Sequence, residues 1–247
     1  MRRGERVPAP LLKQNDSSEM QALLTAVAEE LKLPLLHISR SAELAEITKN
    51  PAQEVLQQVQ QTASSALELI DSYMLGLQLA GRQQILQLEP VSASSVIYDV
   101  AHKLHKVAER YEVGLEMQLK GAHEPVMANQ EGLKAALLSM GTAFIEAQPH
   151  GDKRQTITLA AYRTSGGFAA GMYSEACNIS PAQLRAAIRF YGKIRQPLGQ
   201  FSASGAAGIF VAQQILQAMA AQLKAARHHK QAGIAAILQP SRQLQLI

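Results

Sequence analysis

Apolar residues in the first third of the chain recur with the spacing of paired helices. Between residues 20 and 45 they are separated by alternating steps of four and three, and the same alternation returns between residues 56 and 80. Such heptad seams are typical of helices that pack along one another. Asn50-Pro51 interrupts the first seam and Gly81 follows the second. We therefore predict an antiparallel helical hairpin over residues 16–82.

Further apolar residues make the stripe on this hairpin wider than one seam requires. They are Leu23, Leu35, Leu67, Leu69 and Met74. A lone hairpin cannot cover such a stripe, whereas two hairpins can bury it in a four-helix bundle. We therefore predict a homodimer.

Beyond residue 82 helical periodicity and strand alternation follow one another. The predicted helices span about 92–111, 129–147, 181–191 and 207–221. A first strand is predicted ahead of the helix at 92–111, and the other predicted strands span 113–119, 156–163, 168–174, 223–228 and 232–238. This succession predicts an α+β domain over 83–247, an α/β sandwich in which a mixed sheet carries helices on one face. Residues 1–15 are expected to be a flexible leader, and residues 192–205 a loop.

Composition narrows the class of protein. Apolar residues make up 47% of the chain, which is enough for a core, and the one cysteine, Cys177, excludes an internal disulfide framework and fits a reducing cytoplasm. The net charge of +4 is spread along the chain without a basic stripe, so we expect no nucleic-acid partner. No apolar run is long enough to span a bilayer, so we expect no membrane insertion and a cytoplasmic location.

One segment of the first helix has a recognisable motif. Residues 27–35 read Val-Ala-Glu-Glu-Leu-Lys-Leu-Pro-Leu. They resemble the H-box of bacterial sensor histidine kinases, roughly His-Glu-Leu-Arg-Thr-Pro-Leu, and the order of hairpin and sandwich resembles the core of that family. The resemblance implies a dimerisation and phosphotransfer hairpin followed by a Bergerat-type ATPase-like domain. It places the family's phosphoacceptor histidine on Glu29, whose carboxylate cannot form a phosphoramidate.

The resemblance also places the family's nucleotide motifs on altered residues. The two asparagines of the N-box fall on Ser139 and Ala143. The Asp-x-Gly-x-Gly and Gly-x-Gly-x-Gly motifs fall on the following residues: Ser174, Ala176, Asn178, Ser204, Ala206 and Gly208. Magnesium needs oxygen ligands, and Ala143 offers none. A phosphate cradle needs approachable backbone N–H groups, which the side chains of Ser204 and Ala206 obstruct. We therefore predict that ATP and magnesium are bound weakly or not at all, and that no other metal or cofactor is held.

These departures suggest a signalling protein that is not an enzyme, a pseudo-histidine kinase. On this hypothesis the hairpin binds a partner such as the receiver domain of a response regulator, through a surface formed by Glu29, Glu30, Lys32, Leu33, His37 and Arg40. One alternative is a histidine phosphotransferase that uses His37 as its phosphoacceptor. A second alternative is a structural oligomerisation protein. His37 follows Leu35-Leu36, so we expect its side chain to be half-buried.

Other candidates for chemistry are weaker. His102 and His105 stand three residues apart on one predicted helix, a spacing that a metal ion can use, but the sequence offers no evident third ligand. Cys177 has no evident histidine or aspartate partner, and we expect a small buried side chain.

Overall fold

The fold of the chain is known from a computed structural model. It describes residues 28, 31–32, 34–45, 52–81, 86–119, 125–149, 155–177, 179–188 and 203–241. The helices are residues 34–45 of the first helix, α2 (Ala52–Gly81), α3 (Ala93–Arg110), α4 (Gln130–Glu146), α5 (Pro181–Ile188) and α6 (Ala203–Ala218). The strands are β1 (Glu89–Val91), β2 (Gly114–Gln118), β3 (Val126–Ala128), β4 (Thr156–Thr164), β5 (Gly167–Ser174), β6 (Gln222–His228) and β7 (Gln231–Pro240).

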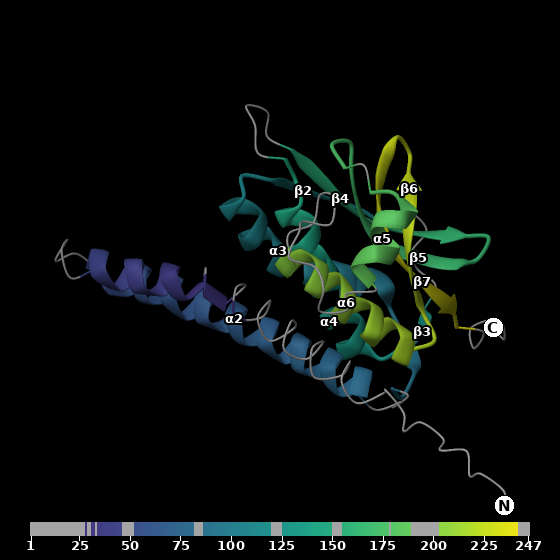
Figure 1. The fold of residues 1–247 in the computed structure, drawn as a ribbon, viewed down its shortest axis with the longest axis horizontal. Coiled ribbons are helices and arrows are strands. Elements are labelled where there is room, and N and C mark those ends of the chain that lie inside the picture. Colours follow the sequence, from purple (N-terminus) through teal and green to yellow (C-terminus); the bar gives the residue numbers. More distant parts are fainter. Residues whose placement is uncertain are drawn as a thin grey trace, which may run out of the picture.

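The elements form a long helical hairpin beside a sheet covered by helices (Figure 1). The predicted fold class, a helical hairpin followed by an α+β sandwich, is therefore confirmed. The predicted leader (1–15) and the predicted start of the first helix (16–27) lie outside the described residues. The sheet has the order β1-β3-β7-β5-β4-β2, and β6 pairs with β7 on the edge opposite β5, the edge that β3 meets at the end of β7. The pair β2–β4 is parallel, and every other pairing is antiparallel. The sheet is thus mixed, as the sequence predicts.

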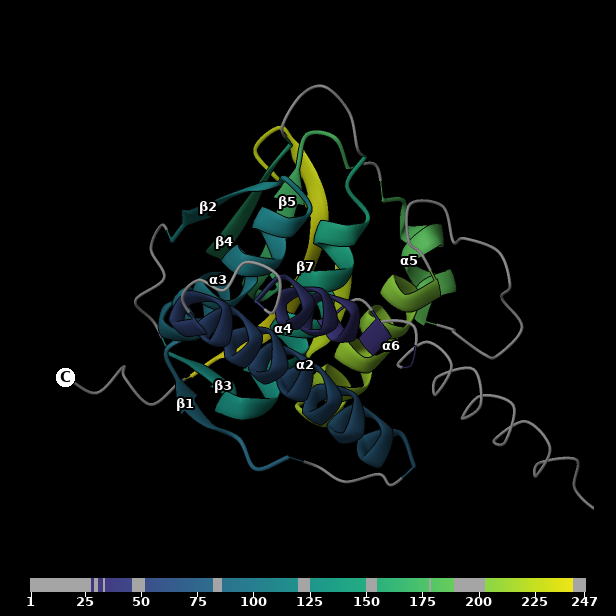
Figure 2. The ribbon, with the colours of Figure 1, turned by 90° about the vertical axis from the view of Figure 1, so that its left-hand side faces the viewer.

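The helices lie in two layers on the same face of the sheet. Helices α3, α4 and α6 cover the sheet, and α2 lies outside them, packed mainly on α6 and α4 (Figure 2). The first helix runs beside the outer part of α2, away from the sheet (Figures 1 and 2). One half of α2 therefore belongs to the body of the molecule, while the other half projects from it with the first helix.

Short polar residues fix where two of the covering helices begin. The Ser92 hydroxyl accepts a hydrogen bond from the backbone N–H of Ser95 at 3.3 Å and starts α3. The Asn129 side chain accepts one from the N–H of Gly132 at 2.9 Å and starts α4. Each cap satisfies a backbone donor that the first turn of a helix leaves unpaired.

The contact between α2 and the body is close and apolar. Tyr73 is only 1% exposed and belongs, with Leu79, to the same hydrophobic core as the sandwich. A Cβ atom added to Gly76 would lie 2.7 Å from Cγ1 of Val211 on α6, so only glycine allows this approach. Tyr73 falls on the heptad spacing of the second predicted seam, between residues 56 and 80, but it packs into the sandwich instead.

The side chains of the central strands alternate between the two faces of the sheet and belong to two hydrophobic clusters. Residues such as Leu159 and Met172 face the helices and form the main core. On the opposite face Tyr173 is fully buried, and its hydroxyl lies 3.0 Å from that of Tyr162. The ring of His228 stacks on Tyr162 with centroids 4.7 Å apart, and its Nε2 lies 3.1 Å from the side-chain oxygen of Gln118. His228 therefore helps to cover the face of the sheet that carries no helix.

Three details differ from the predicted elements. The strand β3 (Val126–Ala128) was not predicted and inserts between β1 and β7. Helix α6 begins at Ala203, inside the predicted loop, because the run from Ala203 to Ala207 contains one glycine among small residues that a helix accommodates. The predicted helix at 181–191 is described only as far as Ile188.

Candidate functional site

The hairpin presents three of the predicted surface residues to solvent. Lys32, His37 and Arg40 are all exposed on the first helix. Arg40 follows His37 by three residues, so their side chains leave the helix on neighbouring positions of one face. The prediction that the His37 side chain is half-buried is wrong, because that side chain is exposed. The two leucines before it, Leu35 and Leu36, are also 59% and 49% exposed.

The positions assigned to the nucleotide motifs meet between α4 and α6. Ser139 and Ala143 lie on the buried face of α4, at 2% and 1% exposure. A Cβ atom added to Gly208 of α6 would lie 3.0 Å from the backbone oxygen of Ser139 and 3.5 Å from Cβ of Ala143. Three residues from two separate motifs are thus in one helix–helix contact, and Ala206 is buried on the same helix at 1% exposure.

This contact does not fit a magnesium ion between the two helices. Ala143 has no oxygen to donate, and the approach of Gly208 leaves no space for an ion between the backbone of α6 and this turn of α4. The Ser139 hydroxyl is buried with no hydrogen-bond partner among the described residues. These positions therefore serve helix packing.

The third motif lies where β5 ends. Ser174 is fully buried, and its hydroxyl accepts a hydrogen bond from the backbone N–H of Ala176 at 3.3 Å. Ser174 therefore stabilises the turn that follows the strand, in the manner of short polar residues at turns.

Cys177 lies in the same turn and is 5% exposed, as predicted from the sequence. Burial raises the pKa of the Cys177 thiol to about 11, although a backbone hydrogen bond with Ile179 acts in the opposite direction. The thiol is therefore protonated at neutral pH and is not an activated nucleophile.

Several predicted site residues lie outside the described part of the chain. They are Glu29, Glu30, Leu33 and Asn178. Ser204 lies in the first turn of α6, where the backbone is described and the side chain is not.

Two hollows on the body were not predicted. One, of about 260 Å³, lies between α2, α3 and α4 and is lined by two lysines and two carboxylates, Lys103, Lys134, Asp71 and Glu131, together with neighbouring side chains. The other, of about 190 Å³, lies between α3 and β2 beside Tyr98 and Met117. Tyr98, His102 and His105 recur on α3 at steps of four and three, beside the buried stripe of that helix. That spacing is the signal by which the second hollow could have been found.

The described residues contain no group of three histidine, cysteine or acidic side chains placed to hold a metal ion. Among the helices described, none combines the length and the apolar character that crossing a bilayer requires.

Comparison with known proteins identifies the fold. No protein-family model and no curated protein sequence matches the chain. The structure of the Acinetobacter baumannii histidine kinase AdeS aligns over 85% of this chain and 96% of its own, with 12% identity and a TM-score of 0.50. Full-length ShkA in complex with AMPPNP aligns over 90% of this chain and 46% of its own, with 17% identity and a TM-score of 0.52. A bacterial phosphotransferase aligns over 94% of this chain and 100% of its own, with 12% identity and a TM-score of 0.47.

This comparison corrects one prediction. We expected the protein not to be an enzyme, because the residues of the family's chemistry are replaced. That prediction is wrong: the similar structures are histidine kinases, which are enzymes, and nothing in the described residues establishes that catalysis is lost. The order of hairpin and sandwich, by contrast, agrees with these structures over most of the chain. The chain therefore has a core with the fold of a sensor histidine kinase, a helical hairpin packed on an ATPase-like α/β sandwich.

Proposed function

We propose that the protein is a signalling protein of the two-component type that carries a phosphoryl group on His37. The observation that carries this proposal is the exposure of the His37 side chain on the first helix. An accessible imidazole nitrogen can attack the phosphorus atom of a receiver domain's aspartyl phosphate. The bond from phosphorus to the carboxylate oxygen breaks, a phosphorus–nitrogen bond forms, and the imidazole loses its N–H proton to solvent. The reverse step returns the group to a second receiver domain.

The charges around His37 support this role. Arg40 is exposed one turn beyond His37, so its guanidinium can approach the doubly charged phosphoryl group. Lys32 is exposed five residues before His37, on another side of the helix, where it can contact the receiver domain itself. The acidic residue Glu43 lies on the same helix, where it accepts a hydrogen bond from Ser39 at 3.4 Å. That bond holds the carboxylate against its own helix. We propose that Lys32, His37 and Arg40 form the surface on which the receiver domain docks.

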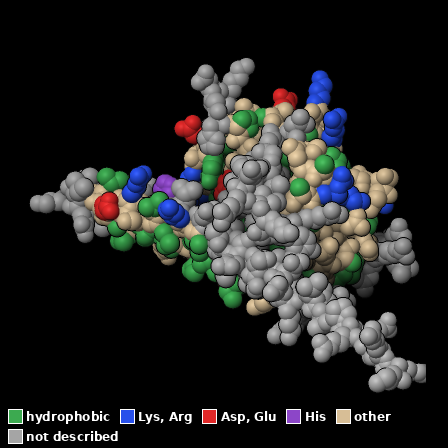
Figure 3. Space-filling view, viewed as in Figure 1, with side chains coloured by type: hydrophobic (Ala, Val, Ile, Leu, Met, Phe, Trp, Pro, Cys, Tyr) green, Lys and Arg blue, Asp and Glu red, His purple; other side chains and the backbone are tan. Residues whose placement is uncertain are grey.

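The proposed active form is a homodimer. Exposed apolar side chains gather along the hairpin, where they appear as a green band in Figure 3. They include Leu44, Leu56, Leu67 and Met74, which are 59%, 62%, 61% and 53% exposed. Contiguous apolar surface of this kind marks an interface in soluble proteins, and a second hairpin would cover it in a four-helix bundle.

We propose that the phosphoryl group comes from another phosphorylated protein, with ATP bound weakly or not at all. The packing of Gly208 on Ser139 and Ala143 supports this part of the proposal, because that contact occupies the positions assigned to magnesium and phosphate. Thermal melting in the presence and absence of millimolar Mg-ATP tests it, since a ligand bound in that range would raise the melting temperature. An increase of several degrees would contradict it.

The phosphotransfer proposal is tested with radiolabelled receiver domains. The full chain is mixed with receiver domains from the same genome that carry ³²P-phosphate, and the label is followed on a denaturing gel. We expect an acid-labile, base-stable label on the chain, as for a phosphoramidate, and its loss in His37→Gln. His102→Gln replaces another exposed histidine and should keep the label.

Two results would refute His37 as the carrier: a label that persists in His37→Gln, and no transfer from any receiver domain of the genome. A structural oligomerisation protein would give the second result while still eluting as a dimer. Size-exclusion chromatography of the same samples measures the dimer that both functions predict, and the transfer assay separates the two.

A further inference from the structure

We propose that the edge strand β2 and the hollow beside it bind an extended peptide, which adds a strand to the sheet. The peptide carries apolar side chains at alternate positions and a basic residue between them. This site lies on the body of the molecule, away from His37, and the proposal is independent of phosphotransfer. It rests on the open edge of β2, on the apolar side chains along it and on the charge of Glu116.

Strand β2 is the last strand of the sheet on its side. It pairs in parallel with β4, and no described strand pairs with its other edge. The N–H of Gly114 points toward β4, where it donates to the carbonyl of Gln155 at 2.7 Å. Because backbone groups alternate along a strand, the N–H and C=O groups of Leu115 and Met117 point to the open edge. An added strand would pair with these two residues.

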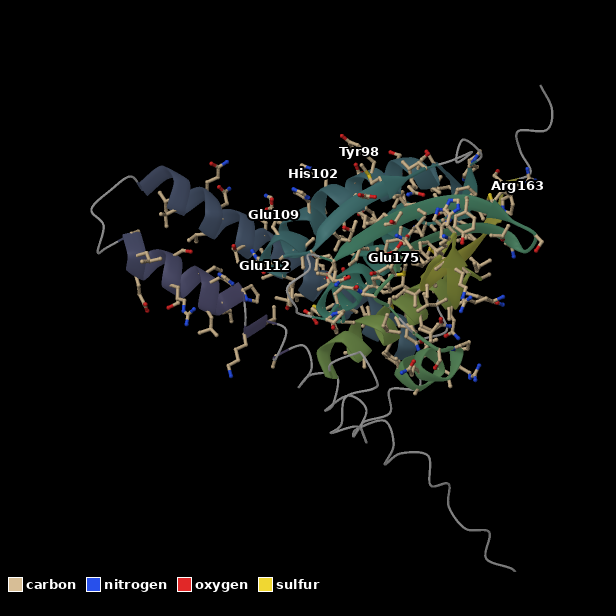
Figure 4. All side chains as sticks on the ribbon, turned by 90° about the horizontal axis from the view of Figure 1, so that it is seen from above. Tyr98, His102, Glu109, Glu112, Arg163 and Glu175 are labelled. Carbon is tan, nitrogen blue, oxygen red and sulfur yellow. The ribbon has the colours of Figure 1, made fainter. Side chains whose placement is uncertain are left out.

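The side chains of the same two residues line the hollow. Leu115 and Met117 face Tyr98, Ala101, His102 and His105 across a volume of about 190 Å³. Tyr98 is 61% exposed and Met117 is 46% exposed, although both are large apolar side chains. Figure 4 shows Tyr98 and His102 side by side along α3. This volume is smaller than a typical cofactor site, of about 300 Å³ or more, and suits one or two aliphatic side chains.

The charge of Glu116 determines which peptide residue fits between the apolar positions. Glu116 is exposed and stands between Leu115 and Met117, on the opposite face of β2. A side chain directly across from it on an added strand would lie about 5 Å away, where an opposite charge stabilises the pair and a like charge destabilises it. Nearby, Glu112 is exposed and Glu109 is paired with His105 at 3.2 Å. The site therefore favours lysine or arginine opposite Glu116 and disfavours an acidic peptide.

The probe is a fluorescein-labelled peptide, Ser-Val-Lys-Leu-Lys-Val-Ser, titrated with the full chain and followed by fluorescence anisotropy. We expect binding that is at least about tenfold tighter than for the scrambled peptide Ser-Lys-Lys-Val-Leu-Val-Ser, which has the same composition without the alternation. Methylation of the backbone nitrogens of the three apolar residues should abolish binding, because it removes the donors that pair with an antiparallel neighbour. Equal binding of the scrambled or methylated peptide would refute strand addition.

Variants of the chain locate the site. Tyr98→Ser should weaken binding about tenfold, since an exposed aromatic anchor is lost without disturbing the core. Glu116→Lys should weaken binding of the lysine peptide and strengthen binding of a peptide with glutamate at those positions. Glu89→Lys makes the same change on β1, at the opposite edge of the sheet, and should leave both affinities unchanged.

Three further results would overturn the proposal. They are the absence of binding at millimolar peptide, equal effects of Glu116→Lys and Glu89→Lys, and an unchanged affinity in Tyr98→Ser. A melting curve for each variant checks that its fold is intact.

Discussion

Ser139 is a hydroxyl side chain enclosed between two helices. It is 2% exposed, and its oxygen has no hydrogen-bond partner among the described residues. A buried polar group without a partner costs free energy, because it loses its hydrogen bonds to water on folding. We therefore expect Ser139→Ala to raise the free energy of unfolding by about 1 kcal/mol, measured by urea denaturation.

Ser92→Ala is the matched control for this change. The Ser92 hydroxyl caps α3 through the N–H of Ser95, so its removal should lower the free energy of unfolding by about 1 kcal/mol. The same chemical change is thus predicted to have opposite signs at the two sites. A loss of stability in Ser139→Ala would mean that this hydroxyl has a partner in solution.

The sequence predicted which residues lie together better than it predicted how exposed they are. It assigned Ser139, Ala143 and Gly208 to one site from separate motifs, and α4 and α6 do bring them into contact. It expected the neighbourhood of His37 to be half-buried because two leucines precede it, yet both are exposed. Periodicity gives the face of a helix on which a residue lies, but the partner that covers that face comes from tertiary packing.

Among the elements, the contact between α2 and α6 depends on one small residue. A Cβ atom on Gly76 would lie 2.7 Å from Val211, a branched side chain on the buried face of α6. Gly76→Leu should therefore push the two helices apart and lower the free energy of unfolding by about 1–3 kcal/mol, as overpacking does in other cores. Urea denaturation followed by circular dichroism measures this change.

Gln78→Leu introduces the same side chain two residues farther along α2, at an exposed position. It should change the free energy of unfolding by less than about 0.5 kcal/mol. If Gly76→Leu were equally harmless, α2 would not be held against α6 at this point in solution.

The elements themselves were largely predictable from the chain. Helices α3 and α4 agree with their predicted limits to within a residue or so, because each has a long apolar period and a polar cap. Strand β3 was missed, since three residues are too few to establish an alternation. Its neighbours in the sheet, β1 and β7, come from distant parts of the chain, so its pairing depends on tertiary structure.

At the scale of the whole molecule, the hairpin and the sandwich share one hydrophobic core. Tyr73 of α2 is 1% exposed and lies in the same cluster as residues of the sheet. Tyr73→Ala should therefore lower the free energy of unfolding by about 3–5 kcal/mol, and it should do so for both parts of the molecule. Hydrogen exchange of amides in α2 beside Tyr73 and in β5 and β7 measures the two parts separately.

Gln78→Ala changes an exposed residue of the same helix and should leave both sets of exchange rates nearly unchanged. Faster exchange confined to α2 in Tyr73→Ala, with the sheet unaffected, would contradict a common core. A second contact across the same boundary is the hydrogen bond that Arg110 of α3 donates to Thr62 of α2 at 3.1 Å.

The burial of Tyr73 and Leu79 in the sandwich limits where this chain can be cut and joined to another protein. Signalling proteins are commonly engineered by exchanging one module for another across a linker. Here a cut after Gly81 would leave two core side chains on the free hairpin and an open depression over α4 and α6. Both fragments would then expose apolar surface that promotes aggregation. A functional chimera would therefore have to carry the inner half of α2 together with the sandwich, and join the foreign hairpin farther out along the helix.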